Sequence, residues 1–91
     1  MQTGLYIIGT PIGNLSDMSP RAIETLQNVD LIAAEDTRVF GKLAKHFNIR
    51  TKIISCHEHN ERDVVDYLVE KIQSGMAIAT VSDAGMPGVS D

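Results

Sequence analysis

Residues 76–91 read MAIATVSDAGMPGVSD and join an apolar run to a turn rich in glycine and proline. The run from 76 to 81 has the length and the composition of a buried strand. Gly85, Pro87 and Gly88 exclude both helix and strand from the loop that follows. Because open α/β sheets bind ligands at the carboxyl ends of their strands, we expect a binding site at this acidic loop, which leaves a central strand.

The rest of the chain alternates between short apolar runs and longer segments with helical periodicity. Strands are expected at 5–8, 31–34, 51–55 and 76–81, and helices at 20–28, at 39–47 and from a cap at Asn60 to Gly75. Ser19 is expected to cap the first helix ahead of Pro20, and Asn48 to cap the end of the second. The regular alternation predicts an α/β three-layer sandwich with a mainly parallel sheet. The first strand, apolar on both faces, is expected to be covered by helices on each side.

Length and composition indicate one soluble globular domain of 91 residues, with 43% hydrophobic and 22% charged residues. The first apolar stretch, 5–8, is too short for a signal sequence or a membrane span. The single cysteine, Cys56, cannot form an internal disulfide, which favours a cytoplasmic location. Because the sequence stops inside a turn motif, we expect a longer protein to continue beyond residue 91.

Two familiar site types are not favoured by the motifs. The loop 9–14 has Pro11 and Asn14 where a dinucleotide-binding fingerprint needs its second and third glycines, and no phosphate-binding Gly-Lys-Ser or Gly-Lys-Thr occurs. Four potential metal ligands stand in a row at 56–59, but neighbouring side chains at a strand end point to opposite sides. No metal site is therefore predicted, and Glu58 and His59 are expected to approach a substrate or a partner domain.

Five of the eight basic residues lie between 38 and 52, a stretch without any acid, although the net charge of the chain is −4. They are Arg38, Lys42, Lys45, Arg50 and Lys52, and we call them the basic strip. Helical spacing places several of them on one face of the second helix. Two interpretations stay open, a solvated surface or a set of contacts to nucleic-acid phosphates.

Three motifs together resemble the tetrapyrrole-methylase-type family of S-adenosylmethionine-dependent methyltransferases: YIIGTPIGNL at 6–15, AEDTR at 34–38 and SDAGMPGVSD at 82–91. The resemblance covers nearly the whole chain. It implies that residues 1–91 form the N-terminal α/β domain of a two-domain enzyme whose C-terminal domain is absent here. S-adenosyl-L-methionine would be held in the cleft between the two domains.

Within this family, the closest resemblance implies 2′-O-methylation of a cytidine ribose in small-subunit (16S) ribosomal RNA, with the 30S subunit as partner and a homodimer as the assembly. The alternatives are a tetrapyrrole-type small-molecule methylase of the same family and a non-catalytic nucleotide- or RNA-binding fragment. The residues implied to contact the cofactor are Pro11, Ile12, Gly13, Ser82, Asp83, Ala84, Gly85, Met86 and Pro87. Asp83 suits the ribose hydroxyls as an acceptor.

Glu35 and Asp36, which follow the second expected strand, are the candidates for a catalytic carboxylate. A carboxylate that takes the proton of the attacking ribose hydroxyl would act as a general base. Two other interpretations are a solvated strand end and an Asp36–Arg38 pair that orients the substrate.

Overall fold

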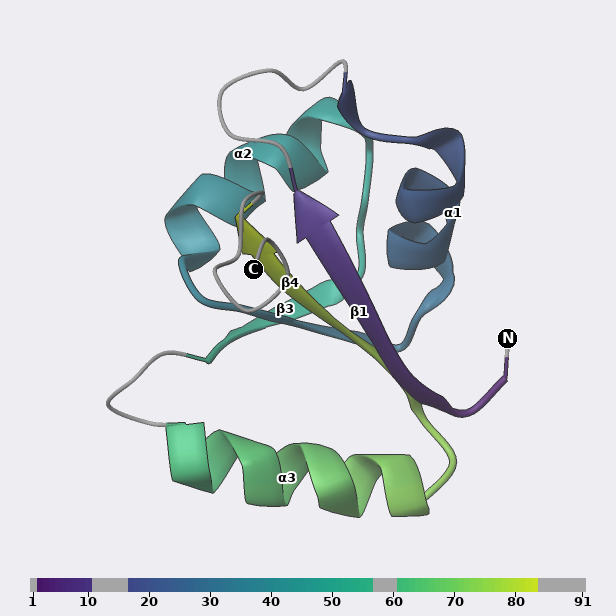
Figure 1. Ribbon diagram of the computed structural model, residues 1–91, viewed down its shortest axis with the longest axis vertical. Coiled ribbons are helices and arrows are strands. Elements are labelled where there is room, and N and C mark those ends of the chain that lie inside the picture. The colour runs from purple at the N-terminus through teal and green to yellow at the C-terminus, as the bar shows by residue number, and fades with distance from the viewer. Residues whose placement is uncertain (1, 11–16, 57–60, 84–91) are drawn as a thin grey trace, which may run out of the picture.

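The computed structural model describes residues 2–10, 17–56 and 61–83, which form a three-layer α/β sandwich (Figure 1). Its elements are β1 (Gly4–Thr10), α1 (Pro20–Asn28), β2 (Leu31–Ala34), α2 (Thr37–His46), β3 (Lys52–Ser55), α3 (Glu61–Gln73) and β4 (Ala77–Asp83). The four strands are all parallel and lie in the order β1-β4-β2-β3. Helices α1 and α2 cover one face and α3 the other. The predicted class, and the central position of the last strand, are confirmed.

Local sequence signals define the ends of the first two helices. The Ser19 hydroxyl accepts a hydrogen bond from the Ala22 amide (3.1 Å), and Pro20 takes the first helical position. Asn48, with φ at 57°, ends α2 in the left-handed conformation that asparagine tolerates. Helix α2 begins at Thr37, two residues before the predicted start, because Asp36 caps it. Asn60, the predicted cap of α3, lies outside the described residues.

The core lies on both faces of the two central strands, β2 and β4. Leu26, Phe40 and Leu43 of α1 and α2 pack in one cluster with the sheet, and Leu68 of α3 packs with Ile78 in the other. Every residue of β2 is buried. Because burying one such large apolar side chain contributes about 1.5–3 kcal/mol, these two clusters hold β2 and β4 firmly at the centre of the sheet.

One side chain fixes the alignment of the two central strands. Asp30, just before β2, accepts a hydrogen bond on Oδ2 from the Ala77 amide (2.8 Å), and its own amide donates to the Ala77 carbonyl (2.8 Å). The Ala77 amide is at a position only 2% exposed, so the carboxylate satisfies a donor that water does not reach. This clamp sets the register that brings the carboxyl ends of β2 and β4 to the same level.

The first strand differs from its prediction. Leu5 and Ile7 are 49% and 72% exposed, although Tyr6 and Ile8, which point to the other face, pack against the α1–α2 cluster. The physical reason is position: β1 is an edge strand, and α3 packs across β2 and β4. The expectation that helices cover both faces of this strand is therefore wrong for the part of the chain that the structure describes. In the same part, no helix is long and apolar enough to cross a membrane.

Candidate functional site

The candidate site is the edge of the sheet where all four parallel strands end. Thr10 of β1 lies beside Asp83 of β4, and Gly9 lies beside Ser82. On the other side of β4, Val81 pairs with Ala34 at the end of β2. The first and the last loop motifs thus begin on adjacent strands, where the paired residues are 73 positions apart in sequence. The predicted meeting of these loops at one edge is consistent with this register.

Thr10 links the two strands that carry those loops. Its side chain is only 6% exposed and its Oγ1 donates a hydrogen bond to the Ser82 carbonyl (3.0 Å). Thr10 is the last residue of β1, and Ser82 is the last but one of β4. The hydrogen bond therefore holds together the two points at which the loops begin. Sequence reasoning did not single out Thr10. A threonine at the end of an apolar strand is a weak signal, since its partner is distant in the chain.

Of the predicted cofactor contacts, Ser82 and Asp83 lie at the carboxyl end of β4. Pro11, Ile12, Gly13, Ala84, Gly85, Met86 and Pro87 lie outside the described residues. A separate groove runs between β1 and α1, where Tyr6, Ile8, Ala22 and Thr25 are among the lining residues. None of the predicted site residues lines this groove.

Glu35 and Asp36 stand at the end of β2, next to β4, and both are exposed. Asp36 Oδ1 accepts hydrogen bonds from the amides of Arg38 (3.0 Å) and Val39 (3.2 Å). The carboxylate of Asp36 thus caps α2 through the backbone amide of Arg38. Among the described contacts it forms no ion pair with the Arg38 guanidinium, and an Asp36–Arg38 pair that orients the substrate stays an interpretation.

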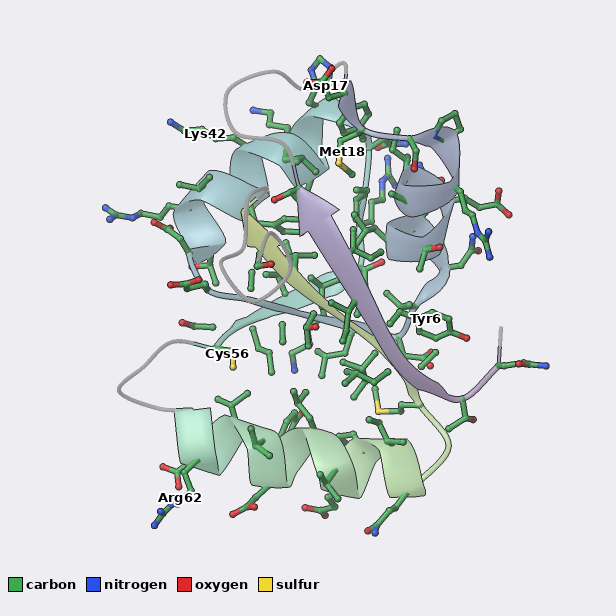
Figure 2. All side chains as sticks on the ribbon, in the orientation of Figure 1. Tyr6, Asp17, Met18, Lys42, Cys56 and Arg62 are labelled. Carbon is green, nitrogen blue, oxygen red and sulfur yellow. The ribbon has the colours of Figure 1, made fainter. Side chains whose placement is uncertain are left out.

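Of the four potential metal ligands at 56–59, the described residues include only Cys56. Its amide donates to the Ala34 carbonyl (2.8 Å), and its half-buried side chain packs in the cluster between the sheet and α3 (Figure 2). His57, Glu58 and His59 lie outside the described residues. Within the described ranges, no three His, Cys, Asp or Glu side chains gather as a metal site would need. Cys56 therefore serves the packing of α3 against the sheet.

The basic strip faces solvent. Arg38, Lys42 and Lys45 lie on the side of α2 opposite the buried Phe40 and Leu43, and Figure 2 shows Lys42 pointing away from the body of the protein. Arg50 and Lys52 are exposed at the turn into β3, and Arg50 Nε donates to Asn48 Oδ1 (3.4 Å). None of the five has an acidic partner among the residues that the structure describes. Within that part of the chain, the five side chains are exposed and no carboxylate neutralises their charges.

Comparison with known proteins agrees with this arrangement. The sequence profile of the tetrapyrrole (corrin/porphyrin) methylases matches residues 4–91. The chain is 62% identical over 87 residues to a Synechocystis sp. protein, 56% over 87 residues to one from Vibrio cholerae and 53% over 90 residues to one from Escherichia coli O157:H7. Each of these is named ribosomal RNA small subunit methyltransferase I.

The matches cover 96%, 96% and 99% of this chain but only 31%, 30% and 32% of those relatives. The chain thus spans about a third of their length. With a family match over nearly every residue, and with the motifs that carry it starting from adjacent strand ends, the chain belongs to the tetrapyrrole methylase family.

Proposed function

We propose that this chain is the cofactor-binding part of a methyltransferase that modifies the 2′-hydroxyl of a cytidine in small-subunit ribosomal RNA. The observation that carries the proposal is the 62% identity over 87 residues to a protein named for that RNA. The rest of such a protein would supply the C-terminal domain, and the assembly would be a homodimer acting on the 30S subunit in the cytoplasm.

The edge of the sheet where the strands end suits the chemistry of S-adenosylmethionine. Thr10 and Asp83 lie side by side at the strand ends, and parallel sheets bind ligands there. A carboxylate at Asp83 suits two ribose hydroxyls, because it offers acceptors only. Ser82 and the loops at 11–13 and 84–87 would hold the remainder of the cofactor. When bound, the cofactor supplies a sulfonium methyl group, which an oxygen nucleophile takes while the sulfur leaves as a neutral thioether.

The RNA would approach across α2. The basic strip offers five cations without acidic partners in the described structure, and Arg38 starts the strip within three residues of Glu35. Such cations position a backbone by contacting phosphates and carry no sequence information. The Glu35–Asp36 pair would then lie between the bound RNA and β4, where the cofactor is expected, and would provide the base.

Methylation of 30S subunits by the full-length protein tests this proposal. Subunits from a strain without the modification would be incubated with a labelled methyl donor, and the RNA digested to nucleosides. We expect label in 2′-O-methylcytidine, and cofactor binding measurable by calorimetry. Label in a base, or transfer to a tetrapyrrole and none to RNA, would contradict the proposal.

A further inference from the structure

Asp36 is committed to the backbone of α2. Its carboxylate oxygen Oδ1 accepts from two amides of the first helical turn, and its carbonyl accepts from the Phe40 amide (3.0 Å). The first amides of a helix have no partner within the helix, so this side chain replaces the missing acceptors. Protonating the carboxylate would weaken the hydrogen bonds that begin α2. Asp36 is therefore poorly suited to accept a proton in each reaction cycle.

Glu35 lies between two anchored neighbours. On one side, the Ala34 carbonyl accepts from the Cys56 amide (2.8 Å), and Ala34 is only 1% exposed. On the other side, Asp36 is held by the start of α2. The Glu35 side chain is exposed, and its carboxylate makes no hydrogen bond or ion pair with the residues that the structure describes. An anchored backbone thus carries an exposed carboxylate, without a partner among the described residues, at the edge where the substrate would arrive.

We propose that Asp36 is a positioning residue, whose capping of α2 holds Glu35 at the end of β2, and that Glu35 is the carboxylate that receives the ribose proton. This inference rests on the proposed function and divides the work between two adjacent acids. As the 2′-oxygen bonds to the methyl carbon and the sulfur–carbon bond breaks, the hydroxyl proton passes to a Glu35 carboxylate oxygen. After the product departs, Glu35 releases the proton to water, and its carboxylate is ready for the next reaction cycle.

Substitutions in the full-length protein separate the two roles. Glu35→Gln removes the base, and we expect kcat/KM for 30S subunits to fall roughly 10²–10⁴-fold, the range typical of a lost general base, with cofactor affinity retained. Asp36→Ala removes the cap and should also lower kcat/KM. Asp36→Asn keeps an oxygen acceptor, and asparagine caps helices as well as aspartate does, so it should restore most of that loss.

The pH dependence supplies a readout that a purely structural role would not move. The acid limb of the kcat/KM profile reports protonation of the base. It should persist in Asp36→Asn and disappear in the residual activity of Glu35→Gln. Asp66→Asn, at an exposed carboxylate on α3, is the matched control and should behave as the unsubstituted protein.

Two results would overturn the assignment: an Asp36→Asn protein as impaired as Asp36→Ala, or a Glu35→Gln protein within about fivefold of the control. Amide exchange in the 91-residue chain judges the cap without any activity. Exchange at Arg38 and Val39 should accelerate in Asp36→Ala and not in Asp36→Asn, and equal exchange in all three proteins would refute the cap. If the unsubstituted enzyme leaves 30S subunits unmethylated, the proposed function and the role of Glu35 both fail, whereas the exchange result on Asp36 stands.

Discussion

Neutralising part of the basic strip should reduce the salt dependence of RNA binding by a calculable amount. The change is Lys42→Gln, Lys45→Gln and Arg50→Gln together in the 91-residue chain. All three side chains are exposed and have no acidic partner within the described residues. Their removal therefore deletes contacts to phosphate without releasing an unpaired carboxylate. Stability should barely change, since exposed side chains of this kind contribute little to it.

The expected magnitude follows from counterion release. Each phosphate neutralised on a single strand contributes about 0.7 to the slope of log K against log salt, so three contacts contribute about 2. Between 50 and 200 mM salt, the unsubstituted chain should therefore lose about 20-fold more affinity than the triple variant. Fluorescence anisotropy with a labelled single-stranded segment of small-subunit ribosomal RNA, titrated at several potassium chloride concentrations, measures both slopes.

A matched control is available within the chain. Arg21, Arg62 and Lys71 are the three cations outside the strip, and replacing them with glutamine changes the net charge equally. This control should keep the slope of the unsubstituted chain. If both triple variants flatten the slope alike, the chain binds RNA through its overall charge. If neither does, α2 presents an ordinary solvated face and the proposed RNA path is wrong.

Three further predictions concern the cofactor edge, the core and the open strand. In the full-length protein, Asp83→Ala should abolish S-adenosylmethionine binding with the fold intact, because the residue lies at the end of a strand; calorimetry that shows unchanged affinity would refute this. Asp30→Ala should lower the free energy of unfolding by about 1.5–3 kcal/mol in urea titrations, because the buried Ala77 amide loses a charged acceptor. Asp30→Asn should recover much of that loss, and two equally stable variants would show that the clamp is unimportant. The 91-residue chain should fold, fail to methylate 30S subunits and self-associate through the face at Leu5 and Ile7. Sedimentation should show that Leu5→Lys with Ile7→Lys gives monomers, and single-turnover methylation by the chain alone would contradict the proposal that a C-terminal domain completes the site.

Features that depend on neighbours in the sequence were predictable. Ser19 with Pro20 marks the start of α1, and Asn48 marks the end of α2. Both were predictable because helix caps are formed by residues directly next to the helix in sequence. The 3.6-residue repeat placed Phe40 and Leu43 in the core and the cations of α2 outside. The alternation of strands and helices predicted the parallel sheet, and handed crossovers leave few other arrangements.

Features that depend on distant partners were not predictable in the same way. The capping role of Asp36 was missed, because the same carboxylate suits a helix cap, an ion pair and a base. The sequence contains no sign that Thr10 bonds to the Ser82 carbonyl or that Asp30 holds the Ala77 amide, since these partners lie 72 and 47 residues apart.

By itself, the sequence determined the element types, the start of α1, the outer face of α2 and the family. Local propensity, hydrophobic periodicity and the three motifs are properties of short stretches, and they can be identified without knowing which strands pair. Only the tertiary structure decided that β4 lies between β1 and β2, which brings Thr10 and Asp83 side by side at the strand ends. It also decided that β1 is an edge strand, on which Ile7 is 72% exposed. The physical reason is that an apolar strand has the same sequence whether both its faces are covered or one is open. Which neighbours cover it is set by packing between elements far apart in the chain.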